Sequence, residues 1–379
     1  MKKNAYYPLI ALLLLLFITI FLAIGSMKTS TIPPSIVKNI TLNGSDDLPL
    51  LPEVAVNPNG AYVYVTNDRF ATVSVISTHN NTVVATIRVG IPNVTFPEGI
   101  VVAPDGNYMY VADSGSNTIS VISTVNNTLV SNISIRNTSV NGNPWWLAIT
   151  PDGKYLYASS HVISIVSTSN NTVVGSLEVN DSGLSKIAFS PDSKYAYAAI
   201  CCSHNNSILK IATRNNTIVG RIAVNGQPFG VALTPDGRYL YVTNIYTDNV
   251  TIISTYENAA IGSINVGALQ FGISGIPNGA YVYVADRKGI SVIDTTNNSV
   301  AYMVNNVGSP EGVAATPDGK YVYVSYDSVS NTSFTPVVSV LSTPTKVTST
   351  IPPLYIITIM ILVMLIAALY LIGLRARTA

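Results

Sequence analysis

TPDGRYLYVTN, at residues 234–244, is the stretch that decides the fold, because six variants of it recur along the chain. The other copies span residues 57–67, 103–113, 150–160, 190–200, 276–286 and 316–326. Every copy joins a Pro-Asp-Gly-type turn to a run in which tyrosines alternate with small apolar residues, as expected of a β-strand after a tight turn. The turn prolines lie about 40 to 47 residues apart, a period typical of a β-propeller blade. The sequence therefore predicts an all-β fold, a seven-bladed β-propeller.

One repeat, residues 226–266, contains four strand-like runs, at 229–234, 238–244, 249–255 and 260–266. Four antiparallel strands joined by short turns make one propeller blade. The last repeat stops after its third strand, at residue 343, whereas residues 36–44 resemble an outer strand. We expect this N-terminal strand to complete the last blade and close the ring. The Pro-Asp-Gly turns then share one face with the Asn-Asn-Thr turns, and the remaining loops form the opposite face, called the top face here.

Both ends of the chain are apolar. Residues 9–24 follow two lysines, and residues 354–374, which are long enough to cross a bilayer, precede two arginines. The first run suits either an uncleaved anchor or a signal peptide. We therefore predict an N-terminal transmembrane anchor or signal peptide (1–27), a Pro/Thr linker (28–35), the propeller (36–343), a second Pro/Thr linker (344–353), a C-terminal transmembrane helix (354–374) and a cytoplasmic tail (375–379).

The basic flanks and the glycosylation motifs predict an exported propeller. The positive-inside rule places both termini in the cytoplasm if the first segment is uncleaved, so the chain would sit in the cell membrane with its propeller extracellular. Asn-x-Ser/Thr sequons, which matter on exported surfaces, support this placement, although Asn-Asn-Thr is also good turn chemistry. The candidate glycosylation sites are Asn39, Asn43, Asn80, Asn93, Asn126, Asn132, Asn137, Asn170, Asn180, Asn205, Asn215, Asn249, Asn297 and Asn331.

The charge content is low. Charged residues make up 10% of the chain, against about 25% in ordinary soluble proteins. A formal net charge of +1 gives no basic surface for nucleic acid, so we expect no nucleic-acid partner. Few ionisable groups also mean few groups whose protonation could destabilise the fold as the pH falls. We take this as an indication of an acidic habitat.

Few residues in the sequence carry obvious chemistry. The histidines at 79, 161 and 204 lack metal-ligand spacing, so we predict no catalytic residues, no metal and no cofactor, with a divalent cation at the channel mouth as the alternative. Cys201 and Cys202 are adjacent, and outside the cell they could form a vicinal disulfide. Free thiols and an intermolecular disulfide are the other readings of this pair.

The positions six residues before each turn proline should rim the top mouth of the central channel. Three glutamates from neighbouring blades would form an acidic arc, and aromatic residues the opposite arc, with Trp146 behind. Such a mouth suits a divalent cation, a cationic group or a sugar ring, whereas the alternative is ordinary variation of the repeat. The paired tyrosines of each repeat are expected to pack between blades. The candidate mouth residues are Glu53 (from a blade one residue shorter), Glu98, Glu311, Trp145, Phe229 and Phe271, with Ser185 in the fourth blade.

These phrases, together with NTVV-type and INVG-type outer strands, resemble the YVTN-type β-propeller repeat over residues 36–343. That family is known from microbial, notably archaeal, cell-surface and S-layer-associated proteins. The resemblance implies an extracellular seven-bladed propeller used for surface binding or structure. One departure is that the third strand keeps the acid of the family's Ile-Asp-Thr ending only at Asp294.

We therefore predict a membrane-anchored, glycosylated, non-catalytic cell-surface propeller whose partner is an extracellular protein or glycan, such as the S-layer. The alternatives are an extracellular propeller enzyme of the lactonase, lyase or quinoprotein type that uses the channel mouth, and a structural coat subunit. Fold analogy carries much of this prediction.

Overall fold

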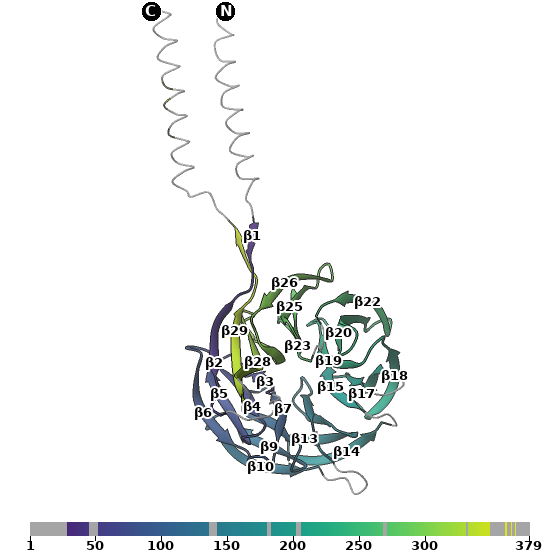
Figure 1. The fold of residues 1–379 in the computed structure, drawn as a ribbon. Coiled ribbons are helices and arrows are strands. Elements are labelled where there is room, and N and C mark those ends of the chain that lie inside the picture. The colour runs from purple at the N-terminus through teal and green to yellow at the C-terminus, as the bar shows by residue number, and fades with distance from the viewer. Residues whose placement is uncertain are drawn as a thin grey trace, which may run out of the picture. The chain divides into compact units, whose positions relative to one another are not determined.

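The structure is a computed structural model that describes residues 29–44, 52–135, 142–179, 183–201, 206–267, 271–330 and 333–348, with positions 361, 365 and 368. The chain divides into two compact units, residues 34–343 and the two chain ends. In the first unit, seven four-stranded antiparallel sheets are arranged as the blades of a ring (Figure 1). The predicted all-β, seven-bladed propeller is confirmed.

Each of the first six blades follows the chain from an inner to an outer strand. We number the blades by their inner strands. Blade 1 contains β3 (Val54–Val56), β4 (Tyr62–Asn67), β5 (Thr72–Ser77) and β6 (Thr82–Arg88), and blade 2 contains β7 (Pro97–Val102), β8 (Tyr108–Asp113), β9 (Thr118–Ser123) and β10 (Thr128–Ser134). Blade 3 contains β11 (Trp146–Ile149), β12 (Tyr155–Ser159), β13 (Val162–Ser167) and β14 (Thr172–Glu178), and blade 4 contains β15 (Leu184–Phe189), β16 (Tyr195–Ile200), β17 (Ser207–Ala212) and β18 (Thr217–Ala223).

Blades 5 and 6 keep this order, and blade 7 differs only in its outer strand. Blade 5 contains β19 (Pro228–Leu233), β20 (Tyr239–Asn244), β21 (Asn249–Ser254) and β22 (Ala259–Asn265), and blade 6 contains β23 (Ile273–Gly275), β24 (Tyr281–Asp286), β25 (Gly289–Asp294) and β26 (Ser299–Asn305). Blade 7 contains β27 (Ser309–Ala315), β28 (Tyr321–Ser330), β29 (Ser333–Ser342) and, as its outer strand, β2 (Ile36–Thr41). The N-terminal strand thus closes the ring, as predicted.

The repeated turn works as the sequence indicates. In blade 5 the hydroxyl of Thr234 donates a 2.6 Å hydrogen bond to Asp236, and the backbone N–H of Arg238 donates to the same carboxylate at 3.0 Å. Gly237 follows with a φ of 71°, a conformation that favours glycine. The turn then leads into β20, where Tyr239 is exposed and Tyr241 is buried.

The core lies between the blades. Among the described residues, seven hydrophobic clusters each combine side chains from two neighbouring blades. The second tyrosine of each repeat is almost fully buried there. In four of the blades its hydroxyl donates to the second asparagine of the next blade's Asn-Asn-Ser/Thr turn, as Tyr241 does to Asn298 at 2.6 Å. That asparagine has a positive φ of 53°. The predicted packing between blades is confirmed for the second tyrosine of each repeat, whereas the first tyrosine is exposed in blades 1, 2, 3 and 5.

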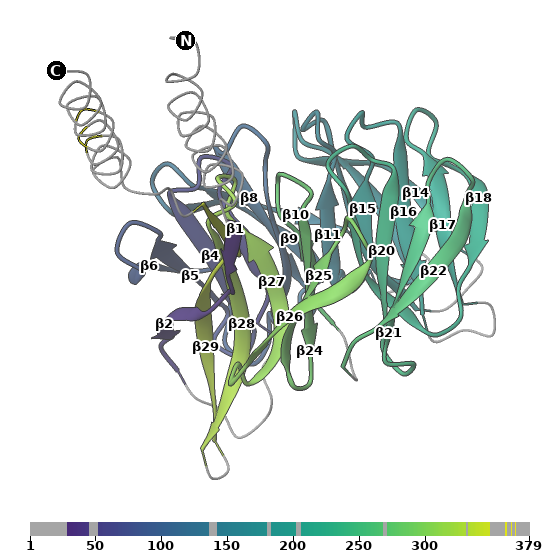
Figure 2. The same cartoon turned by 90° about the horizontal axis from the view of Figure 1, so that it is seen from above.

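One blade extends beyond the repeat pattern. In Figure 2 the paired ends of β28 and β29 project past the neighbouring strands, and their pairing continues to Ser330 and Ser333. The projecting hairpin connects a second to a third strand, so it belongs to the top face.

The second unit is described mainly within the predicted linkers. There β1 (Thr29–Ile32) pairs antiparallel with β30 (Thr345–Thr348). No helix among the described residues is long and apolar enough to cross a membrane. The predicted membrane segments, 1–27 and 354–374, lie outside the described residues apart from three single positions.

Candidate functional site at the channel mouth

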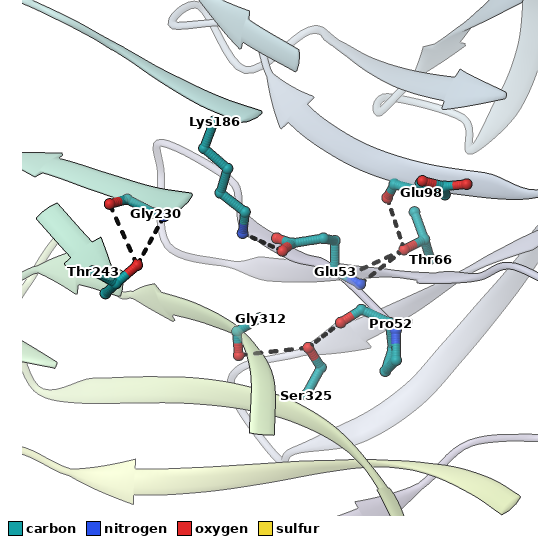
Figure 3. Close-up of polar contacts among 9 residues, drawn as sticks. All are labelled: Pro52, Glu53, Thr66, Glu98, Lys186, Gly230, Thr243, Gly312 and Ser325. Atoms are coloured by element: carbon teal, nitrogen blue, oxygen red, sulfur yellow. Dashed lines mark hydrogen bonds and ion pairs between the residues drawn. The ribbon is translucent and has the colours of Figure 1, made fainter. Parts of the chain in front are cut away.

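Strand pairing places Glu53 one residue further along its inner strand than the sequence suggested. Val54 pairs with Val65 just as Val231 pairs with Val242. The backbone N–H of Glu53 donates to Thr66 at 2.9 Å, and that of Gly230 donates to Thr243 at 2.8 Å (Figure 3). Glu53 is therefore equivalent to Gly230 rather than to Phe229. We call this position the inner row, and it holds Glu53, Gly99, Trp146, Lys186, Gly230, Gly272 and Gly312.

The glycines of the inner row are required by the close approach of neighbouring blades. A Cβ at Gly99 would lie 2.6 Å from the Trp145 carbonyl oxygen, and one at Gly230 would lie 2.6 Å from that of Phe271. Blades 1 and 2 are also joined by a hydrogen bond from the second strand of blade 1. The Thr66 hydroxyl donates to the Glu98 carbonyl at 3.0 Å (Figure 3). The inner row thus presents only three side chains, from blades 1, 3 and 4.

Two of these three side chains form an ion pair. The Lys186 ammonium binds the Glu53 carboxylate, although their blades lie three apart in the ring (Figure 3). The side chains are only 19% and 14% exposed. The third side chain, Trp146, has the same ammonium 4.7 Å from its ring centroid, a cation–π contact. Sequence reasoning missed Lys186. The signal that could have found it is a lysine aligned with four glycines.

The aromatic arc contains Trp146 rather than Trp145. Trp146 packs edge-on against Phe229 at 5.4 Å between ring centroids, and Phe229 packs in the same way against Phe271 at 5.5 Å. Trp145 is 37% exposed and lies 6.2 Å from the ring of His161. The structure therefore brings together two of the three predicted aromatic residues, joined by the tryptophan that was placed behind them.

The predicted acidic arc is divided. Glu98 accepts a 2.6 Å hydrogen bond from Ser114 in its own blade, and Figure 3 shows its side chain extending away from Glu53. Burial raises the pKa of Glu98 to about 7, and the Ser114 hydrogen bond opposes this shift. Ser185, the predicted mouth residue of blade 4, is buried.

Glu311 has the most perturbed carboxyl of the mouth. Burial raises its pKa to about 9, the charges of Asp327, Glu53 and Asp68 act in the same direction, and the ammonium of Lys186 opposes them. A carboxylic acid with this pKa is protonated at neutral pH and can donate a proton or a hydrogen bond.

Glu311 lines a pocket of about 220 Å³ between blades 6 and 7, together with Phe271, Arg287, Ser309 and Pro310. Arg287 follows β24 in a top-face loop and is exposed. Within the described part of the chain it has no ion-pair partner. Because the neighbouring carboxyl is protonated, the guanidinium leaves the pocket positively charged. Sequence reasoning also missed this arginine, which lies in a loop rather than in the repeat.

Residues 53–178 and 161–265 match the family model described as lactonase, 7-bladed beta-propeller. The chain belongs to this family. Its fold is also similar to the solved structure of Kuenenia stuttgartiensis hydrazine synthase, with a TM-score of 0.64 and 22% sequence identity over 75% of this chain and 94% of that chain. No match is found among curated proteins.

Membership of this family corrects the prediction that the chain is not an enzyme. A family of lactonases points to a hydrolase, and the mouth pocket contains a protonated carboxyl and an arginine, which are groups that such chemistry can use. The propeller part of the sequence resemblance is confirmed, whereas the finer YVTN-type assignment remains a prediction.

The other candidate residues lie away from the pocket or outside the described part of the chain. His79 and His161 are exposed, Cys201 is buried, and His204 and Cys202 fall outside the described residues, so the vicinal disulfide remains a prediction. Among the described residues, no three histidine, cysteine or acidic side chains are grouped so that they could hold a metal ion.

The predicted glycosylation sequons differ in exposure, and some lie outside the described residues. Asn249 is half-buried, and Asn137, Asn180, Asn205 and Asn331 lie outside the described residues. In several of the turns the sequon hydroxyl donates to the first asparagine, as Thr82 does to Asn80 at 2.8 Å. Turn chemistry therefore accounts for these copies. The exposed sequon asparagines are Asn39, Asn43, Asn80, Asn93, Asn126, Asn132, Asn170, Asn215 and Asn297.

Proposed function

We propose that this propeller is a hydrolase that opens a small lactone at its top mouth. The observation that carries the proposal is the pocket in which Glu311 lies together with Arg287 and Phe271, where burial raises the pKa of the Glu311 carboxyl to about 9. The pocket, at about 220 Å³, is smaller than the roughly 300–1,000 Å³ of drug-sized ligand sites. It therefore suits a molecule of one ring.

Each side chain has a role in this proposal. The guanidinium of Arg287 binds an anionic substituent of the lactone, since a planar fork of donors matches a carboxylate. Phe271 supports a face of the ring. Glu311 donates its proton to the ring oxygen as water attacks the carbonyl carbon and the ester C–O bond breaks. Glu311 regains a proton that the water loses, and the product is the open hydroxy acid.

The test is a panel of γ- and δ-lactones, with and without a carboxylate, incubated with the full-length protein and followed by proton release in a pH-stat. We expect turnover of at least one carboxylate-bearing lactone and its loss in Glu311→Gln, which keeps the shape of the side chain. Asp152→Asn, a change in an exposed turn on the opposite face, is the matched control and should leave turnover unchanged. Hydrolysis that continues at the wild-type rate in Glu311→Gln would contradict the proposal.

The location of the enzyme is a separate part of the proposal. The apolar runs at 9–24 and 354–374, with their basic flanks, support anchoring in a membrane with the propeller outside the cell. The YVTN-type resemblance supports the same placement. Retention of the protein in carbonate-washed membranes, and protease access to the propeller from outside intact cells, would test it. Release of the full-length chain by carbonate would argue against anchoring.

A further inference from the structure

We infer that Glu53 and Lys186 act as a pair of positioning residues for Glu311. Their opposite charges together set how tightly the Glu311 carboxyl holds its proton. The inference rests on the proposed function, because it concerns the acid of that reaction. Neither residue lines the pocket. Both belong to the inner row, where the other blades except blade 3 carry glycine. Two large charged side chains at such a position call for an explanation.

The backbone places Glu53 beside the acid. Glu311 lies on β27 and Glu53 directly precedes β3, the inner strand of the next blade. A Cβ at Gly312 would lie 3.0 Å from the backbone nitrogen of Val54, and the hydroxyl of Ser325 donates to the Pro52 carbonyl (Figure 3). The segment that carries the acid is therefore packed directly on the segment that carries Glu53.

The ion pair holds the Glu53 carboxylate in a protected place. Lys186 binds it from the opposite side of the ring, and Trp146 covers the ammonium. Both charged side chains are less than a fifth exposed. Charges in such surroundings act on their neighbours more strongly than charges in water. A buried ion pair is by itself weak evidence of stabilisation, which leaves an electrostatic role open to it.

The charged groups around Glu311 act on its protonation in opposite directions, so the effect of each can be tested separately. The acid feels Asp327 from its own blade, Asp68 from the loop after β4, and the Glu53–Lys186 pair, and Arg287 lines the same pocket. Glu53 favours the protonated acid, and Lys186 favours the carboxylate that forms when the proton is given away. Burial and Asp327 are the larger causes of the raised pKa of Glu311, and within the pair Glu53 adds to their effect while Lys186 limits it.

The experiment measures the titration of Glu311 directly, without substrate. Glutamate labelled with ¹³C at the side-chain carboxyl is incorporated into the full-length protein, and the Glu311 signal is assigned by its loss in Glu311→Gln. Glu53→Gln and Lys186→Met each remove one charge and break the same ion pair. We expect the midpoint to fall by about one pH unit in Glu53→Gln and to rise by about one in Lys186→Met. Lys186→Arg keeps the charge and should leave the midpoint in place.

Opposite shifts are the decisive feature, because a purely structural role for the pair would move both midpoints in the same direction. Midpoints that move together, or that do not move, would overturn the inference. The double variant Glu53→Gln/Lys186→Met, with both sites neutral, should titrate between the two single variants and provides a second comparison if one of them folds poorly. The expected shifts without turnover of any lactone would contradict the proposed function but not this inference. Turnover without the shifts would contradict this inference but not the proposed function.

Discussion

The hydroxyl of Tyr323 in blade 7 donates a 2.6 Å hydrogen bond to Oδ1 of Asn81 in blade 1, across the seam where the ring closes. The same relationship joins Tyr110 to Asn171, Tyr157 to Asn216 and Tyr241 to Asn298 in neighbouring blades. The repeat therefore supplies both partners of this contact. The buried tyrosine comes from the second strand of one blade, and the asparagine comes from the turn between the third and fourth strands of the next. The seam is held by the same contact as blade junctions within the repeat.

Removing the seam hydroxyl should weaken the propeller. We expect Tyr323→Phe to lower the free energy of unfolding by about 1 kcal/mol, because one side of a buried hydrogen bond is lost. Tyr283→Phe is the matched control, since the Tyr283 hydroxyl is buried and finds no hydrogen-bond partner among the described residues. The control should be neutral or slightly stabilising in urea unfolding. Equal losses in the two variants would contradict this account of the seam.

The inner-row glycines should not tolerate a methyl group. We expect Gly230→Ala to lower stability by about 1–3 kcal/mol, because its Cβ would meet the backbone of blade 6 and the blades would have to separate. Gly175→Ala in the outer strand β14 is the comparison, since nothing lies within 4 Å of a Cβ there. That change should be neutral or raise stability by up to about 1 kcal/mol. Thermal unfolding distinguishes the two, and a tolerated Gly230→Ala would show that the blades are not in close contact at this point.

Stability should fall on both sides of a mildly acidic optimum. Burial raises the pKa of Glu311 to about 9, and of Glu98 and Asp113 to about 7, in the folded protein. The stability that these three carboxyls contribute to the fold is fully present below their unfolded pKa values of 4.5 and 3.8. It is lost as the pH rises through the pKa values of the folded protein. The hydrogen bond from Ser190 lowers the pKa of Asp192 to about 2, so the stability it contributes above 3.8 is lost as the pH falls through 2.

Unfolding midpoints measured from pH 2 to 9 should therefore peak at about pH 4, where the stability contributed by both groups of acids is almost fully present. Glu311→Gln should flatten the decline on the alkaline side, and Asp192→Asn the decline on the acid side. Stability that rises steadily from pH 5 to 9 would be incompatible with three buried, protonated carboxyls.

Arg287 should control affinity for the anionic part of the substrate. We expect Arg287→Gln to raise KM for a carboxylate-bearing lactone by about 10- to 100-fold with little change in kcat, because a charge-assisted hydrogen bond is lost from the bound substrate. The KM for a neutral lactone should change much less. Lys288→Gln, which removes the adjacent exposed cation outside the pocket lining, is the control. Similar effects of both variants would point to general attraction rather than to a binding contact.

Much of the fold could be predicted because the blade is repeated. The period of the Pro-Asp-Gly turns determined the number of blades, and the missing outer strand of the last repeat required the N-terminal strand β2 to fill it. The buried tyrosines could also be anticipated, since a side chain that returns in every blade at the same position serves the junction between blades.

The mouth could be predicted only in part. Counting back from the turn proline located Glu98, Phe229, Phe271 and Glu311, but treating the first blade as one residue shorter made Glu53 look equivalent to them. Only strand pairing reveals that Glu53 stands opposite Lys186 in the inner row. Protonation is a further property that residue order does not carry, because the pKa of Glu311 depends on burial and on charges from four other positions.

The most direct test of the central claim is the pH dependence of kcat/KM for the best lactone of the panel, corrected for spontaneous hydrolysis. If protonated Glu311 is the acid, the rate should hold through neutral pH and fall with a midpoint near its pKa of about 9. A catalysed rate that stays level or keeps rising through pH 9 would contradict the claim.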